Sequence, residues 1–195
     1  MPDIAWDEWA WTNEPAAVRV AEEGLYVTAQ EGSDAWRLTS YGFVHDTEHA
    51  LLAPLEQNSA VEVAFRLDFG AQFDQAGVFV RVDHETWVKG GVESSDGEGS
   101  LGAVVTRGVS DWSLSPVPSW AGRLVTMRAS RSGNALTLRA RVDNEPWRLV
   151  RVAPLDEDAT VQAGPFCCAP SRSGLTVLFT SWRTTLPDER LHPEA

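Results

Sequence analysis

Short runs of alternating apolar and polar residues cover much of this chain, and they predict an all-β protein. Residues 61–67 and 78–82 alternate at every second position, which is the period of a strand with one buried face. Turn signals such as Asp96-Gly97 and Asp143-Asn144 separate these runs, at intervals of roughly 8–12 residues. This spacing favours a β-sandwich or a barrel over alternating strands and helices.

The pattern predicts strands along the whole chain and almost no helix. Strands are expected over residues 18–20, 25–29, 34–39, 61–69, 76–83, 86–93, 101–106, 123–130, 135–142, 147–152 and 174–182. A helical turn or two is expected near 154–159. Because no fixed-period repeat and no low-complexity linker divides the chain, residues 1–183 are predicted to form one domain. Residues 184–195 form a polar, proline-containing tail that is expected to fray or to wrap the surface.

The segment from Trp87 to Glu93 carries more chemistry than a strand needs for folding. Strand alternation places Trp87, Lys89, Gly91 and Glu93 on one face, and two valines on the opposite face. One apolar face is enough to hold a strand on a core. An aromatic ring, a cation, a gap and an anion on the other face are typical of a ligand-binding sheet surface. The two glycines near Trp87 are expected to leave a shallow groove beside the ring.

The preceding strand is predicted to pair with this segment as an antiparallel hairpin, through a turn at residues 83–84. If the valines of residues 78–82 face the core, then Gln75 and Arg81 lie on the same outer face as the polar residues just described. The alternative is a solvated face with cross-strand ion pairs such as Arg81 with Glu93, which contribute only about 0.2–1 kcal/mol each.

Four further candidates come from other segments. Arg128 is a polar residue of an alternating run, opposite apolar neighbours. Asp111 and Trp112 follow a β-branched strand and a glycine, in a loop that is expected to close one end of the groove. The alternative is that Asp111 caps backbone amides and Trp112 covers the sandwich edge. Trp36 is a further tryptophan available for stacking.

Two groups of possible ligand or redox residues are assigned structural roles. Residues 45–49 (His-Asp-Thr-Glu-His) suggest a metal site, but the segment is not convincingly helical and no third spaced ligand is evident. A histidine in a polar groove is the favoured interpretation, and no cofactor is expected. Cys167 and Cys168 are adjacent, a geometry that disfavours a disulfide between them, so they are predicted to be buried packing residues.

Composition narrows the expected partners. The net charge of −12 disfavours nucleic acid and anionic membranes but leaves neutral sugars possible. No apolar run approaches the roughly 18 residues of a membrane span. Because the first residues lack the basic and apolar regions of a secretory signal, a cytoplasmic location is expected. Nine tryptophans are a surplus typical of proteins that present flat aromatic faces to sugars or peptides.

The arrangement of acidic residues argues against hydrolysis. A retaining glycosidase needs two carboxyl groups about 5 Å apart, and in a sandwich they commonly lie on one strand face. Lys89 and Gly91 occupy the positions where a second acid is wanted, which leaves Glu93 alone on its strand. Other candidate carboxyl groups are Asp34, Asp74 and Asp111.

Five ordered motifs extend over most of the chain. They are residues 34–43 (DAWRLTSYGF), 73–77 (FDQAG), 87–93 (WVKGGVE), 104–113 (VVTRGVSDWS) and 168–170 (CAP). Together they resemble the regulation-of-enolase protein family, a domain of unknown function in the concanavalin A-like lectin/glucanase superfamily. The resemblance extends from about Trp9 to Trp182. It implies a jelly-roll β-sandwich of two curved antiparallel sheets, and the superfamily often binds carbohydrate on the concave sheet.

The leading prediction is non-catalytic binding of a carbohydrate or a similar polyhydroxylated ligand on the concave sheet. The motif positions are Trp36, Gln75, Trp87, Lys89, Glu93, Asp111 and Trp112, and the resemblance gives none of them a catalytic role. Trp87, with Trp112 or Trp36, is expected to stack on a sugar ring, so that Trp87→Ala abolishes binding without loss of stability. The groups expected to hydrogen-bond the hydroxyls are Gln75, Lys89, Glu93 and Arg128.

Two alternatives remain. One is a glycoside hydrolase or lyase that uses Glu93, which two carboxyl groups facing each other in a groove would favour. The other is a regulatory module whose exposed aromatic residues recognise another protein. A single carboxylate beside a lysine favours binding over both forms of catalysis, because the paired charges leave neither group free as an acid or base.

Overall fold

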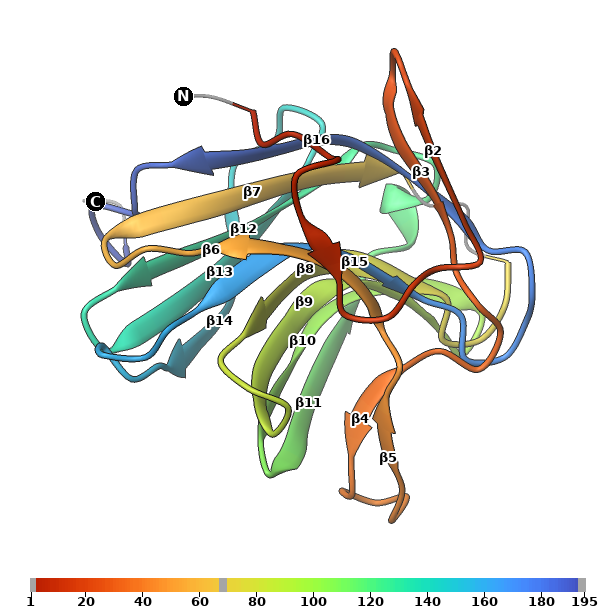
Figure 1. Cartoon of the computed structure of the whole chain (residues 1–195), viewed down its shortest axis with the longest axis horizontal. Coiled ribbons are helices and arrows are strands. Elements are labelled where there is room, and N and C mark those ends of the chain that lie inside the picture. Colours follow the sequence, from red (N-terminus) through yellow and green to blue (C-terminus); the bar gives the residue numbers. More distant parts are fainter. Residues whose placement is uncertain (1–2, 67–69, 193–195) are drawn as a thin grey trace.

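The computed structural model describes residues 3–66 and 70–192, which form a sandwich of two twisted antiparallel sheets (Figure 1). In spatial order the first sheet contains β1 (Ala10–Trp11), β6 (His49–Pro54), β15 (Gln162–Cys168), β8 (Gln75–Arg81), β9 (Thr86–Ser95), β10 (Glu98–Arg107) and β11 (Val109–Pro116). The second contains β14 (Arg148–Pro154), β13 (Ala135–Val142), β12 (Val125–Ser132), β7 (Ser59–Arg66), β16 (Thr176–Thr185), β3 (Gly24–Thr28) and β2 (Ala17–Ala21). A separate hairpin consists of β4 (Ala35–Arg37) and β5 (Val44–Asp46).

This architecture confirms the all-β prediction, but the pattern of apolar and polar residues did not predict several of the strands. Strands β6 and β15 are buried on both faces, so they show no alternation, and β11 is largely exposed, so it shows no apolar stripe. The helical turn expected near 154–159 is wrong, because β14 runs to Pro154 and a 3-10 turn lies instead at Pro118–Trp120. The end of the strand predicted over 61–69 and the end of the predicted tail lie outside the described residues.

The main core lies between the two sheets. Val125, Met127 and Ala129 of β12 face inward, as the alternation predicted. Opposite them, a Cβ atom on Gly90 would lie 2.6 Å from the end of the Leu138 side chain, so a larger residue here requires that side chain to move. In the described residues, the structure has no helix of the length and apolarity that crossing a membrane requires.

Both cysteines are buried free thiols, which confirms their prediction as packing residues. Cys167 belongs to the core between the sheets, and Cys168 lies on the opposite face of the same sheet. Burial raises the pKa of the Cys167 thiol to about 12, so this group stays protonated at neutral pH.

A second apolar cluster covers the outer face of the first sheet. It includes Trp36 of β4, Phe79 of β8 and Trp87 of β9. The Trp87 ring stacks on Phe79 with centroids 5.3 Å apart, and Trp87 is only 4% exposed. The outer face of this sheet is therefore only partly polar. At the N-terminal end of β9, neighbouring side chains cover this face, and Trp87 packs in this apolar cluster.

Arg37 fixes the β4–β5 hairpin to the sheet. Its guanidinium binds Asp46 at 3.1 Å and Glu85 at 2.7 Å. Its backbone N–H donates to Ser110 Oγ at 2.9 Å, and its Nε donates to the Gly108 carbonyl at 3.4 Å. These bonds tie the hairpin to the turns that follow β8 and β10. The hairpin projects beside β11 in Figure 1, and it forms a wall standing over the outer face of the first sheet.

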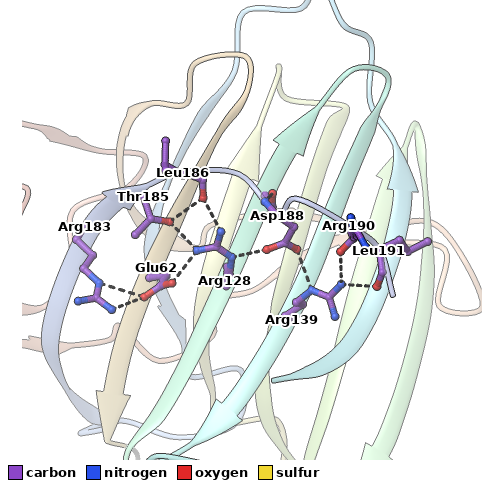
Figure 2. A network of polar contacts seen from close by, with 10 residues as sticks. Glu62, Arg128, Arg139, Arg183, Thr185, Leu186, Asp188, Arg190 and Leu191 are labelled. Atoms are coloured by element: carbon purple, nitrogen blue, oxygen red, sulfur yellow. Dashed lines mark hydrogen bonds and ion pairs between the residues drawn. The ribbon is translucent and has the colours of Figure 1, made fainter. Parts of the chain in front are cut away.

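A chain of alternating charges crosses the outer face of the second sheet (Figure 2). Arg128 donates to Glu62 and to Asp188, each at 2.7 Å. Asp188 also accepts from Arg139 at 2.8 Å, and Arg183 lies 2.6 Å from Glu62. The segment beyond β16 therefore lies across this face, held by ion pairs with the strands beneath it.

This network corrects the predicted placement of Arg128. The alternation correctly predicted that the Arg128 side chain points away from the core. However, β12 belongs to the second sheet, on the far side of the core from β8 and β9. Alternation gives the face of a strand and not the sheet to which the strand belongs, so Arg128 was grouped with residues it does not contact.

Candidate functional site

A cavity of about 410 Å³ lies between the β4–β5 hairpin and the outer face of the first sheet. Strands β8 to β11 form its floor, and the hairpin forms one wall. Pro170 and Ser171, which follow β15, close another side. The cavity lies toward the Glu93 end of β9. Trp36 belongs both to its lining and to the apolar cluster, whereas Trp87 of the same cluster does not line it.

The floor contains an ion pair with a shared amide. Lys89 Nζ donates to Asp34 Oδ1 at 3.0 Å and to Gln75 Oε1 at 2.8 Å. Gln75 Nε2 donates to the same Asp34 oxygen at 3.3 Å. Burial lowers the pKa of Lys89, but Asp34, Cys168 and Glu93 together more than offset this, so its pKa lies above the ordinary value. Lys89 is therefore a charged ammonium that is already compensated by Asp34.

Glu93 is the one group in this floor that the ion pair leaves out. It is 9% exposed, and its Oε1 atom is buried without a hydrogen-bond partner in the described structure. Burial raises the pKa of its carboxyl to about 7, with Lys89 opposing the rise and Asp34 adding to it. A carboxyl group with this pKa exists in both protonation states near neutral pH.

Aromatic rings form the walls. Trp36 makes edge-to-face contacts with Tyr41 at 5.6 Å and with Trp112 at 6.0 Å. Tyr41 stacks on Phe43 at 5.3 Å, and Phe43 meets the His45 ring edge-on at 4.6 Å. The ring plane of Trp36 therefore meets those of Tyr41 and Trp112 at steep angles, whereas Tyr41 and Phe43 are nearly parallel. Trp112, at 38% exposed, offers the largest accessible indole surface among them.

The glycines of the 87–93 motif do not create the groove that the sequence suggested. A Cβ on Gly91 would lie 2.1 Å from the Ala76 carbonyl oxygen, so the close approach of β8 and β9 excludes a side chain there. The hollow above Gly91 and Gly102 measures only about 20 Å³, which suits about one water molecule and no sugar ring. The usable space lies instead beneath the hairpin.

Five of the eight predicted site residues line this cavity. They are Trp36, Gln75, Lys89, Glu93 and Trp112. Arg128 lies on the other sheet, and Trp87 is packed on Phe79 outside the cavity.

Asp111 also lies outside, because the predicted loop is the strand β11. Its side chain points to the opposite face from that of Trp112 and lies 2.8 Å from Arg151 of β14. The groove-closing role predicted for Asp111 is therefore corrected to an ion pair between the edges of the two sheets.

The sequence assigned no role to several cavity residues. The sequence gives Asp34 only as a candidate acid, and it does not single out Tyr41 or Phe43. The signal was present in the motif of residues 34–43, where aromatic residues flank a glycine with φ of +74° that turns the hairpin.

The histidines of the 45–49 segment have different surroundings. His45 lines the cavity, as the groove interpretation predicted. His49 is buried: its Nε2 accepts from the Gln30 N–H and its Nδ1 donates to the Asn13 carbonyl, each at 3.0 Å. Burial lowers the pKa of His49, so the ring stays neutral. No group of three or more metal-ligating side chains occurs in the part of the chain that the structure describes.

Two carboxyl groups that could have acted with Glu93 in catalysis, those of Asp74 and Asp34, are held by basic side chains. Asp74 is fully buried, lies 2.6 Å from Arg172 and accepts the backbone N–H groups of Gly70 and Ala71, so it fixes a loop. Asp34 shares the cavity but is bound to Lys89. The floor therefore offers one carboxyl group that can exchange a proton and one that stays paired.

Comparisons with known proteins agree with the motifs. The family model described as "Protein of unknown function (DUF1349)" matches residues 11–187. "Regulation of enolase protein 1" of Saccharomyces cerevisiae is 34% identical over 177 residues, which cover 91% of this chain and 89% of that protein.

Solved structures share the fold. A functionally unknown protein from Saccharomyces cerevisiae has a TM-score of 0.88 at 33% identity, covering 94% of this chain and 99% of that one. The carbohydrate binding module CBM66 from Bacillus subtilis has a TM-score of 0.56 at 14% identity, covering 90% and 94% respectively. The second likeness concerns the fold alone. Together they confirm the predicted jelly-roll β-sandwich of two antiparallel sheets.

Proposed function

The chain belongs to the family of proteins of unknown function DUF1349, as its motifs predicted, and we propose that it binds a carbohydrate or a similar polyhydroxylated ligand without transforming it. The observation that carries this proposal is the cavity beneath the hairpin: a buried polar floor with an unpartnered Glu93 oxygen, enclosed by aromatic walls. A volume of about 410 Å³ falls within the range of about 300–1,000 Å³ common for small-molecule sites.

The lining of the cavity offers partners both for the apolar C–H face of a sugar ring and for its hydroxyl groups. The exposed indole of Trp112 provides an apolar platform for the C–H face of a ring. Lys89, Gln75 and Glu93 provide donors and acceptors for hydroxyl groups at the floor, where charged partners strengthen each hydrogen bond. The likeness of the fold to a carbohydrate binding module is compatible with this assignment.

An enzymatic role for Glu93 is the second candidate, and one observation favours it. A carboxyl with a pKa of about 7 is suited to general acid or base chemistry. The binding role is preferred because Asp34, the other carboxyl group of the cavity, is held by Lys89 and is not free to act as a second acid or base. Analysis of products after incubation with each bound sugar separates the two roles.

A thermal-shift screen against mono- and oligosaccharides tests the proposal. A ligand of the folded state raises stability by about 2.7 kcal/mol when its concentration is about 100 times its Kd. We expect a concentration-dependent rise in Tm with one class of sugar. The absence of a shift with every sugar, combined with stoichiometric capture of a protein, would replace this proposal with the protein-interaction role.

Replacing Trp112 with alanine is expected to weaken the binding of that sugar about tenfold and to lower stability by less than about 1 kcal/mol, because the ring is exposed at the cavity mouth. Calorimetric titration and urea unfolding measure the two effects. Val109→Ala is the matched control, since Val109 is exposed on the same strand but does not line the cavity. Unchanged affinity in the Trp112 variant would remove this ring from the site.

A further inference from the structure

The charges around the cavity do not balance. Lys89 and Asp34 neutralise each other through their 3.0 Å ion pair. Glu93 is then the surplus group, and its Oε1 atom has no partner among the described residues. When Glu93 is ionised, the floor carries one uncompensated negative charge, in a protein whose net charge is already −12. Such a floor attracts a cation more strongly than a neutral hydroxyl group.

Among the described residues that line the cavity, Lys89 is the one lysine or arginine, and Asp34 already holds it. Strand β9 contributes Lys89, which Asp34 already holds, and the hairpin contributes Tyr41 and His45 to the wall. Cys168 of β15 is buried, and burial raises the pKa of its thiol well above the ordinary value, so it stays neutral. The residues of β8, β10 and β11 that line the cavity carry no charge.

The aromatic walls add a second feature that suits a cation. Trp36 and Trp112 lie at 86° to one another, and Trp36 and Tyr41 lie at 70°. The face of such a ring attracts a cation, because the ring quadrupole is negative at the face and positive at the edge. An ammonium group near the face of a tryptophan or tyrosine gains electrostatic attraction from the ring. A neutral sugar ring, by contrast, needs only one aromatic face on which to stack.

We propose that the ligand of this cavity carries a protonated amine, as an amino sugar does, and that Glu93 receives the ammonium group while the aromatic rings enclose it. This inference rests on the proposed binding function and narrows its ligand class. An ammonium group in the cavity can donate to the Glu93 carboxylate, and it neutralises the surplus charge at the same time. A hydroxyl group supplies only the hydrogen bond.

The binding of such a ligand also moves a proton. Near neutral pH, part of the Glu93 population is protonated in the free protein, because its pKa is about 7. An ammonium group stabilises the ionised carboxylate, so binding releases protons to the buffer. A neutral sugar does not produce this release.

Calorimetric titration of the intact protein at about pH 7 tests the inference. The ligands are matched sets of hexose, hexosamine and N-acetylhexosamine in gluco, galacto and manno configurations, with tetramethylammonium as a cation without a sugar ring. For one configuration, we expect the hexosamine to bind about tenfold tighter than its neutral relatives and to release protons in two buffers of different ionisation enthalpy. Glu93→Gln is expected to abolish both differences. Asp111→Asn, which removes a carboxylate outside the cavity, is expected to preserve them.

The outcomes separate this inference from the proposed function. A hexose that binds as tightly as its hexosamine would overturn the amine inference and leave the sugar site intact. Binding of tetramethylammonium, with no sugar bound, would support the cation site and overturn the sugar-binding proposal. If none of these ligands binds, both are overturned.

Discussion

Replacing Glu93 with glutamine is expected to make the unliganded protein more stable at alkaline pH. The carboxyl is 9% exposed, and burial raises its pKa from 4.5 to about 7. Between these values the folded protein keeps a proton that the unfolded chain releases. The wild type therefore loses about 1.36 kcal/mol of stability per pH unit as pH rises through this window. Glutamine is neutral at every pH and avoids the loss.

The size of this stability difference follows from the pH range between the two pKa values of Glu93. The contribution of Glu93 is fully present below about pH 4.5 and is lost by the time the pH has passed about 7. The stability of Glu93→Gln relative to the wild type should therefore rise by about 2–3 kcal/mol between about pH 5 and pH 8.5. Urea unfolding at a series of pH values measures it, with Asp111→Asn as the control for removal of a carboxylate that is more exposed. Parallel curves for the wild type and Glu93→Gln would show that Glu93 has an ordinary pKa.

Replacing Trp87 with alanine is expected to cost about 3–5 kcal/mol of folding stability, because it removes a buried indole and leaves a cavity beside Phe79. This reverses the expectation drawn from the sequence, in which Trp87→Ala abolished binding and left stability unchanged. The structure places the ring in the apolar cluster under the hairpin, outside the site.

The matched control for Trp87 is Trp112→Ala, which removes the same side chain from the same sheet face at an exposed position. Urea unfolding should show a large loss of stability for the first variant and a small one for the second. Equal, small losses in both would mean that Trp87 is accessible, and the original stacking role would then stand.

The outward-facing residues of β8 and β9 were predictable, and the surface that covers them was not. Alternation placed Gln75, Lys89 and Glu93 on one face, and the hairpin register of β8 and β9 bears this out, with Gln75 opposite Glu93. The same alternation treated Trp87 as equivalent to these residues. It differs because β4–β5 and its neighbours bury one part of this face, which is a contact between segments far apart in the sequence.

Two other predicted placements are wrong, each for a physical reason of its own. Arg128 was assigned to the binding sheet because strand periodicity holds no information about sheet order. Asp111 was assigned to a loop because β11 is an exposed edge strand with polar residues on both faces. By contrast, the ordered motifs located the 34–43 segment that supplies Asp34, Tyr41 and Phe43, although spacing alone did not show how they meet.

The most direct test of the central claim follows the indole N–H signals of the nine tryptophans by two-dimensional NMR during titration with the sugar that raises Tm most. If the cavity beneath the hairpin is the binding site, the signals of Trp112 and Trp36 shift with saturation, while those of the buried Trp120 and Trp182 stay in place. Shifts confined to other tryptophans, with Trp112 and Trp36 unchanged, would contradict the claim and place the ligand elsewhere.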